Sequence, residues 1–297
     1  MKLSAPHTDT GKLQRAALDL LREHAERGEL PTSVRFLFYE LEQRGIVSMV
    51  KPKVQPRARR ARAVPDQGLI DAVRRMRDIG AIPWNWIVDD TRMLHQWRCA
   101  ASVAAYLTES VSLARIDPWH QTVRPVILTE SRTIGGVFAR GVARQYLCPV
   151  AATNGQAGGF LVTNIAPLLA NDATRALYVG DFDLSGGQIE DNTRRVLERH
   201  TGRSFDDDTW ERVAVTAAQA IGLRAQGMTP IVKDDERYRP PHQHEAYEVE
   251  ALTQAVAVSL LRARLDELMP EPLDDVLERQ AQQRERIEAV LRGLDDE

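Results

Sequence analysis

The chain has 297 residues, of which 43% are hydrophobic and 27% are charged, a composition typical of globular proteins with room for two ordinary domains. No run of eighteen apolar residues occurs, which argues against a membrane-spanning helix, and the first residues lack the apolar core of a signal peptide. The two cysteines, Cys99 and Cys148, are too few for a disulfide framework or a cysteine-based zinc site, so we expect a cytoplasmic protein.

The net charge of −3 is unevenly distributed along the chain. Residues 1–120 carry 19 Lys and Arg against 14 Asp and Glu, whereas residues 121–297 carry 20 against 28. In the basic half, residues 51–65 (KPKVQPRARRARAVP) hold six cations, three prolines and no acid, which predicts a solvated basic loop. The asymmetry fits a basic half that meets a polyanion and an acidic half that holds metal, and ordinary surface variation fits it equally well.

The first ninety residues read as helices. The first is predicted over residues 10–28, the second follows a cap at Thr32 or Ser33, and the third spans residues 66–79. The second helix, in TSVRFLFYELEQRGIV, buries a stripe formed by Val34, Leu37, Phe38 and Leu41 and places Arg35, Tyr39 and Glu42 on another face. The segment AIPWNWIVDDTR is expected to form a short strand or wing, which favours a winged-helix type of domain, and one more helix is expected over residues 92–112.

The second half alternates short apolar strands with helices. The strands are predicted in VRPVILTE, YLCPVAAT, RALYVGDFD and ERVAVTAA, and a charged helix is expected from Leu273 onward. This alternation is typical of an α/β fold with a mostly parallel, doubly wound sheet. Because ligands of such sheets lie outside the carboxyl ends of the strands, Glu130, Asp181 and Asp183 are candidate functional residues.

These three carboxylates favour a magnesium site. Asp181 and Asp183 are one residue apart, and two side chains so spaced point the same way in a strand. Acids that converge at one sheet edge repel each other, and Mg²⁺, which prefers hard oxygen ligands, offsets that repulsion. Gly186 and Gly187 permit close approach of a phosphate to the backbone. A capping role for an acid at the start of the following helix is the alternative interpretation.

Tyr39 and Arg35 are the candidate catalytic pair of the helical half. A phenol with an ordinary pKa of about 10 needs assistance to act as a nucleophile toward a phosphodiester. Arg35, one helical turn earlier, is placed to stabilise a phenolate or the scissile phosphate. A surface tyrosine that hydrogen-bonds a neighbour is the more common situation.

These segments resemble the A subunits of type IIB topoisomerases, the topoisomerase VI A type, and the related meiotic double-strand-break transesterases. TSVRFLFYELEQRGIV resembles their catalytic-tyrosine segment, with an Arg one turn before an aromatic–Tyr pair. VILTES and GDFDLSGG resemble their Toprim metal-binding motifs, and IPWNWIVDDTR, DPWHQTVRPVILTE and YEVEAL resemble further segments of bacterial relatives in the same order. The resemblance covers roughly residues 30–265.

The resemblance implies a winged-helix domain at residues 1–115 and a Toprim domain with a C-terminal helical extension at residues 120–297. In a homodimer, each Tyr39 would attack one strand of duplex DNA at the Mg²⁺ site of the partner and leave a 5′-phosphotyrosyl link. Cations would hold the DNA backbone without reading its sequence. These candidate DNA-binding residues are Lys51, Lys53, Arg57, Arg59, Arg60, Arg62, Arg74, Arg75 and Arg77.

The chain also departs from the family. Leu184 stands where members often carry Pro, and no ATP-binding motif occurs, so either a separate B-type ATPase subunit completes the enzyme or the chain only cleaves DNA. Glu248 and Glu250, in YEVEAL, are candidates for the metal site or for structural roles. Two alternatives remain: a Toprim nuclease that uses metal-activated water, and a non-catalytic DNA-binding or assembly protein. A cytoplasmic, nucleoid-associated location follows from the expected partner.

Overall fold

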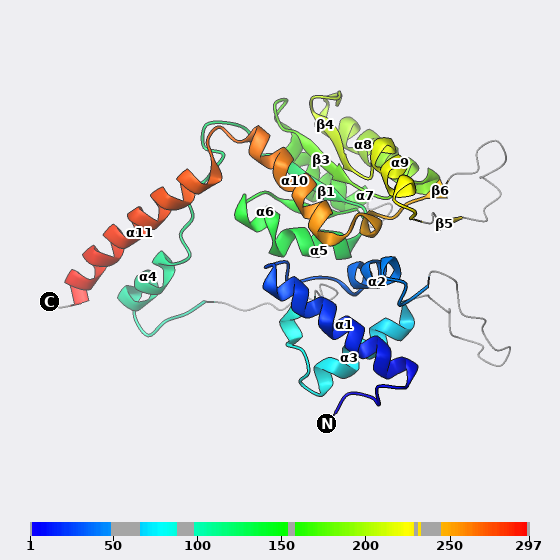
Figure 1. The fold of residues 1–297 in the computed structure, drawn as a ribbon. Helices are drawn as coiled ribbons and strands as arrows, with labels where there is room; N and C mark the ends of the chain where they lie inside the picture. The colour runs from blue at the N-terminus through cyan, green and yellow to red at the C-terminus, as the bar shows by residue number, and fades with distance from the viewer. Residues whose placement is uncertain are drawn as a thin grey trace.

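A computed structural model describes residues 2–48, 66–87, 98–153, 158–228, 231–232 and 245–295. Within these residues the fold is mixed α/β, with a four-stranded parallel sheet and a separate antiparallel pair (Figure 1). The expected α/β class and the parallel sheet are therefore confirmed. Among the described helices, none combines the length and apolar character needed to cross a membrane.

Three helices form the N-terminal part, as the apolar spacing predicts: α1 (Asp9–Glu26), α2 (Val34–Gln43) and α3 (Gln67–Asp78). Ser33 caps α2, where its hydroxyl oxygen accepts the backbone N–H of Phe36 at 3.1 Å. Gly45 follows α2 with a φ of 69°, a left-handed conformation that glycine adopts without steric cost. The three helices pack on one another and lie beneath the sheet in Figure 1.

The segment after α3 differs from the expected strand or wing. Its described part is a single 3₁₀ turn, η1 (Trp84–Trp86), followed by one isolated bridge between Ile87 and Thr32. Residues 88–97, where a wing would continue, lie outside the described residues. The helix expected over residues 92–112 is shorter in the described range: α4 (Val103–Val111) begins after Ser102, whose hydroxyl caps it.

The main sheet has the order β2-β1-β3-β4, and all of its neighbouring strands are parallel. The strands are β1 (Val126–Thr129), β2 (Val150–Ala152), β3 (Ala176–Val179) and β4 (Trp210–Ala214). Two separate clusters of buried side chains cover the two faces: Ile127 and Leu177 point into one, and Leu128 and Tyr178 into the other. Burial on both faces explains why the strands are continuous apolar runs.

Helices connect the strands and cover both faces. Those between β1 and β3 are α5 (Arg132–Arg140), α6 (Val142–Gln145), α7 (Gly158–Phe160), the π-helical η2 (Leu161–Ile165) and the 3₁₀ turn η3 (Ala166–Leu169). Beyond β3 come α8 (Leu184–Thr201), α9 (Ala217–Ala225), β5 (Ile231–Val232), β6 (Glu245–Ala246), the 3₁₀ turn η4 (Val249–Leu252), α10 (Gln254–Leu268) and α11 (Leu273–Asp295).

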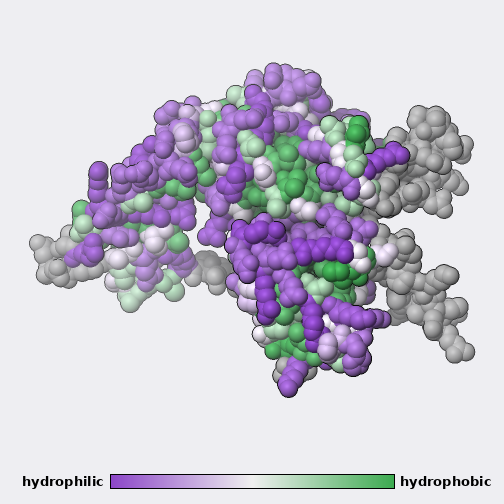
Figure 2. All heavy atoms as spheres, viewed as in Figure 1, coloured by the Kyte–Doolittle hydropathy of each residue, from purple (hydrophilic) through white to green (hydrophobic). Residues whose placement is uncertain are grey.

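The C-terminal helix and α4 form an arm that projects from the body (Figure 1). Gln280 of α11 accepts the backbone N–H of Ile116 at 3.0 Å, and Arg284 donates to the carbonyl of Ala114 at 2.9 Å, so the two segments are held together along the arm. Figure 2 shows hydrophobic residues exposed over α4, which include Val103 and Leu107. The charged C-terminal helix expected from Leu273 is confirmed.

Candidate active site

Two of the predicted carboxylates meet at the carboxyl edge of the sheet. Glu130 follows β1 directly and Asp181 follows β3 by one residue beyond Gly180, and these strands are neighbours with Thr129 paired to Val179. The backbone N–H of Asp181 donates to Oε2 of Glu130 at 3.1 Å. The parallel register therefore brings together two residues that are 51 positions apart.

Asp183 caps a helix, which was the alternative interpretation of its position in the sequence. It is the N-cap of α8, and its Oδ1 accepts the backbone N–H of Gly186 at 2.6 Å. Because β3 ends at Val179, Asp181 and Asp183 do not lie in one strand, and the expected same-side projection of a strand pair does not apply. A carboxylate at a helix N-terminus satisfies an otherwise unpaired amide and interacts well with the helix dipole.

Two further carboxylates, Glu248 and Glu250, reach this edge from a distant part of the chain. Phe182 and Tyr247 form an isolated antiparallel bridge through two backbone hydrogen bonds of 2.8 and 3.0 Å. The backbone N–H of Val249 then donates to Oδ1 of Asp181 at 3.0 Å. The segment YEVEAL is thereby fixed beside GDFD, with Glu248 directly before η4 and Glu250 within it.

Tyr39 and Arg35 of α2 contact the same carboxylates. The hydroxyl of Tyr39 donates a short hydrogen bond to Oε2 of Glu248. Arg35 donates to that oxygen from Nε at 3.2 Å, and its Nε lies 3.3 Å from Oε1 of Glu250. The predicted catalytic pair therefore contacts the segment whose Val249 backbone N–H binds Asp181.

Tyr39 is more buried than its position off the apolar stripe predicts. Its side chain is only 4% exposed, because α2 packs its second face against η4. Burial raises the pKa of the phenol well above its usual range, and the neighbouring charge of Glu248 raises it further. Tyr39 is thus protonated and shielded in this arrangement.

The carboxylates destabilise one another's charged forms. Burial raises the pKa of Asp181 well above its ordinary value, and the like charges of Glu250, Glu130 and Glu248 add to the effect. Burial likewise raises the pKa of Glu250 to about 7, with Arg35 opposing the shift. Burial lowers the pKa of Arg35, but the two glutamates raise it by more, so the guanidinium remains charged. Arg35 forms ion pairs with both Glu248 and Glu250.

The chemistry of this edge fits a hard divalent cation, since every donor is a carboxylate oxygen. As the side chains stand, no three His, Cys, Asp or Glu residues in the described ranges converge closely enough to hold a metal ion. Backbone amides instead hold one oxygen each of Glu130, Asp181 and Asp183. Ligation of a metal by these carboxylates therefore requires the side chains to move.

The predicted DNA-binding cations are only partly described. Lys51, Lys53, Arg57, Arg59, Arg60 and Arg62 lie outside the described residues. Arg74 and Arg75 are exposed on α3. Arg77 instead folds back onto its own chain, where it donates to the carbonyl of Ile87 at 2.7 Å and stacks over the ring of Trp84 at 5.0 Å. Arg77 therefore supports the turn after α3, a role that the run of arginines did not reveal.

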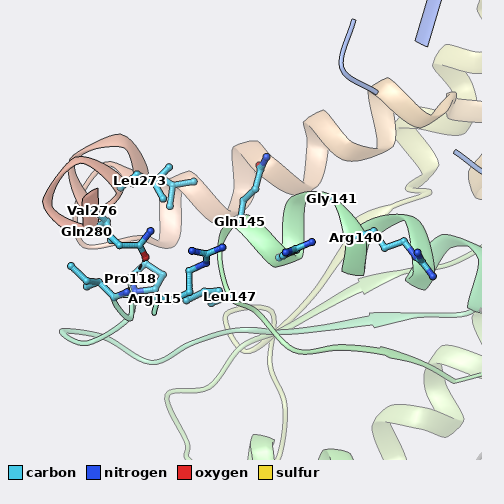
Figure 3. Close-up of a pocket in the computed structure, with 12 residues that line it drawn as sticks. Arg115, Pro118, Arg140, Gly141, Gln145, Leu147, Leu273, Val276 and Gln280 are labelled. Atoms are coloured by element: carbon cyan, nitrogen blue, oxygen red, sulfur yellow. Dashed lines mark hydrogen bonds between the residues drawn. The ribbon is translucent and has the colours of Figure 1, made fainter. Parts of the chain in front are cut away.

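A separate cavity of about 290 Å³ lies where α5 and α6 meet the start of α11 (Figure 3). Arg115, Arg140 and Arg144 contribute its charged lining, together with apolar residues such as Leu273 and Val276. Among the residues that the structure describes, no carboxylate lines it and none of the predicted site residues contributes to it. The cavity is therefore distinct from the acidic edge of the sheet.

No protein-family model matches the chain, and neither a curated protein nor a solved structure matches it. The resemblance to type IIB topoisomerase A subunits consequently rests on the sequence motifs. The geometry adds that Glu130 lies beside Asp181 and that Tyr39 and Arg35 both contact Glu248.

Proposed function

We propose that the chain is a topoisomerase VI A-like DNA-cleaving transesterase, in which Tyr39 attacks the DNA backbone. The observation that carries the proposal is the contact of Tyr39 and Arg35 with Glu248 and Glu250, whose segment binds Asp181 through the backbone N–H of Val249. A nucleophile, a cation and acidic ligands for a metal are the groups that transfer of a phosphoryl group requires. The two-domain arrangement, winged helix followed by Toprim, is part of this proposal.

In the proposed reaction the oxygen of Tyr39 forms a bond to a backbone phosphorus of duplex DNA. The proton of the Tyr39 hydroxyl passes to water, the bond from that phosphorus to the 3′-oxygen breaks, and the 3′-oxygen takes a proton from water. The 5′ end stays on the tyrosine. Tyr39 must first exchange its hydrogen bond to Glu248 for contact with the phosphate, while Arg35 remains charged and pairs with phosphate oxygens. Two strand breaks need two tyrosines, so the enzyme is proposed to act as a homodimer.

Mg²⁺ is the proposed cofactor, held at the edge formed by Glu130 and Asp181. When bound it would offset charge that develops on the phosphate. Arg74 and Arg75 of α3, together with the cations of residues 51–62, are proposed to hold the DNA backbone through salt-sensitive contacts. An ATPase subunit supplied by another chain would be needed for strand passage, because the sequence has no ATP-binding motif.

The test uses supercoiled plasmid incubated with purified protein and magnesium, denatured with detergent, and separated with and without protease. We expect linear DNA whose recovery depends on protease, and we expect Tyr39→Phe to abolish it. Tyr106→Phe, a change at a tyrosine of the distant arm, is the matched control and should leave cleavage intact. Asp181→Ala should also abolish cleavage.

A hydrolytic nuclease is the second candidate, and the burial of Tyr39 favours it. A tyrosine that is 4% exposed and bound to Glu248 is well suited to a structural role, with water as the nucleophile. Under this alternative Tyr39→Phe retains cleavage, no protein remains on the 5′ end, and Asp181→Ala still abolishes activity. Absence of cleavage by the wild-type protein, with DNA binding retained, would favour the non-catalytic alternative.

A further inference from the structure

The cavity of about 290 Å³ between α6 and the start of α11 has a lining of two kinds (Figure 3). Apolar side chains from α11 and from the turn after α6 form one part, and they include Leu147, Leu273 and Val276. Arginines provide the charges: Arg115 follows α4, and Arg144 lies in α6. A space of this volume holds about ten water molecules, which is enough for a small organic molecule.

Arg115 and Arg144 border this cavity without a counter-charge. Within the described ranges, neither guanidinium forms an ion pair or a hydrogen bond with another side chain. Asp117, the acid nearest to Arg115 in the sequence, is bound by Arg124 at 2.6 Å. Arg140 lies at the end of the cavity remote from α11 and adds a third positive charge (Figure 3). Because a guanidinium does not lose its proton in a protein, these charges favour an anion at every pH.

The uncharged polar side chains of the lining also favour an anion. Oε1 of Gln280 accepts the backbone N–H of Ile116 at 3.0 Å, and Oε1 of Gln145 accepts Nη2 of Arg262 at 2.8 Å. Since both amide oxygens are engaged, the other polar atom of each amide is its nitrogen, which donates. The polar side chains that line the cavity, in the part of the chain that the structure describes, therefore offer donors and positive charge.

We propose that this cavity binds a small phosphate monoester, with its phosphate between Arg115 and Arg144 and its apolar body against Leu273 and Val276. A phosphate monoester carries a charge of about −2 at neutral pH and three acceptor oxygens, which matches two unpaired guanidinium groups better than a carboxylate does. The DNA backbone fits less well, because each of its phosphates carries one charge and is flanked by polar sugars and further phosphates.

The ligand would also join the arm to the body of the protein. Leu273 and Val276 belong to α11, whereas Arg144 belongs to α6 beside the sheet. A molecule that contacts both parts binds the folded protein and not the unfolded chain. Its binding should therefore raise the unfolding temperature, and this gives a second readout beside the affinity.

The test is a calorimetric titration of the full-length protein, without DNA or metal, with phenyl phosphate as the probe. We expect phenyl phosphate to bind about 10-fold or more tightly than either inorganic phosphate or phenol, because only phenyl phosphate uses both parts of the lining. Arg115→Ala and Arg144→Ala should each weaken binding by about 10-fold, through loss of a charged hydrogen bond. Arg199→Ala, at an exposed arginine of α8 outside the cavity, is the matched control and should change the affinity by less than about 2-fold.

Leu277→Gln separates the two parts of the lining, because Leu277 is 43% exposed and the fold tolerates a polar residue there. This variant should weaken phenyl phosphate by about 3-fold or more and leave the affinity for inorganic phosphate unchanged. A circular dichroism spectrum checks the fold of each variant, and Arg115 and Arg144 lie in different segments, so one variant supports the other.

Absence of binding in about 10 mM phenyl phosphate would overturn the proposal. Tighter binding of benzoate than of phenyl phosphate would overturn the choice of a phosphate, and an equal loss in Arg199→Ala would show that binding is only a general attraction to positive charge. A short DNA duplex that displaces phenyl phosphate and loses affinity in Arg144→Ala would assign these arginines to DNA instead. Since the titration contains no DNA or metal, a protein that binds phenyl phosphate here but never cleaves DNA retains this inference and disproves the proposed function.

Discussion

The hydroxyl of Tyr39 donates a hydrogen bond to Glu248, a residue 209 positions later in the chain. This bond ties the N-terminal helices to the carboxyl edge of the sheet, and Arg35 binds the same carboxylate one helical turn away. The proposed nucleophile is thus held inside its own chain, whereas the family resemblance implies attack at the partner's site. DNA must compete with Glu248 for both Tyr39 and Arg35 before any reaction.

We expect Tyr39→Phe to lower the free energy of unfolding by about 1–2 kcal/mol, since a hydrogen bond to a charged acceptor is lost in a buried place. A double-mutant cycle with Glu248→Gln, measured by urea denaturation, should give a coupling energy of about 1 kcal/mol. Tyr106→Phe on the arm should change stability by less than about 0.5 kcal/mol. If the two substitutions change the free energy of unfolding additively, the contact between Tyr39 and Glu248 contributes nothing to stability.

Arg35 offers a second test of the cluster. Arg35→Met leaves Glu248 and Glu250 without their counter-charge, and we expect a loss of about 2–3 kcal/mol, reduced from the fully buried case because Arg35 is 45% exposed. Adding Glu250→Gln to this variant should restore most of the stability, because the uncompensated buried charge is removed. Urea denaturation at neutral pH measures both. If Glu250→Gln lowers the free energy of unfolding further, an uncompensated charge on Glu250 is not the reason that Arg35→Met is less stable.

The raised pKa of Glu250 predicts how stability depends on pH. The pKa is about 7 in the folded protein against 4.5 ordinarily, so the folded state binds the proton more tightly. Its contribution is full below pH 4.5 and is lost as the pH rises through 7. In chelator, we expect the free energy of unfolding to fall by about 3 kcal/mol between about pH 5 and 8, with Asp181 acting in the same direction.

Glu250→Gln is the control for this pH dependence, because Gln does not titrate. Its curve of unfolding free energy against pH should be flatter than that of the wild-type protein over the same range. The residues that act on Glu250 are Arg35, Glu248 and Glu130, and none of them changes in this variant. Equal slopes in the two proteins would contradict the shifted pKa.

The sequence predicted the part of the site that follows from sheet geometry. Glu130 and Asp181 end apolar runs, and in a parallel sheet such ends share one edge, so their proximity needed no knowledge of distant contacts. Helix caps were also predictable, because they depend on residues close together in the sequence, as Ser33 shows. For Asp183, the local capping signal was the stronger of the two interpretations, since β3 ends four residues earlier.

The rest of the site depends on contacts that periodicity does not encode. Glu248 and Glu250 reach the sheet edge through one isolated bridge, Phe182 to Tyr247, which has no strand pattern of its own. The same packing explains Tyr39: the 3.6-residue period identifies one buried face of α2, but η4 covers the opposite face as well. Long-range packing decides both features.

The two cysteines should differ in reactivity. Cys148 is buried, and burial raises the pKa of its thiol to about 12, so little thiolate exists near neutral pH. Cys99 is exposed. We expect Ellman's reagent to label one thiol quickly in the native protein and the second only after unfolding. Cys99→Ser should remove the fast phase, and a fast phase that persists would place the reactive thiol at Cys148.

Gly186 and Gly187, neighbours in the first turn of α8, provide a matched pair of substitutions. A methyl group on Gly186 would lie 2.3 Å from the backbone oxygen of Asp181, whereas a methyl group on Gly187 meets nothing within 4 Å. Gly187→Ala should therefore stabilise the protein by about 0.5–1 kcal/mol, the usual gain from replacing a helical glycine. Gly186→Ala should destabilise it by about 1–3 kcal/mol, because the backbone must move.

The same pair tests the link between α8 and the acidic edge. The backbone that Gly186→Ala displaces carries Asp181, so magnesium affinity should fall in this variant and stay unchanged in Gly187→Ala. Thermal unfolding with and without magnesium measures stability and binding in one experiment. Equal magnesium affinity in the two variants would mean that the close approach of Gly186 to Asp181 does not position the carboxylate. Gly186 would then be needed only for the first turn of α8.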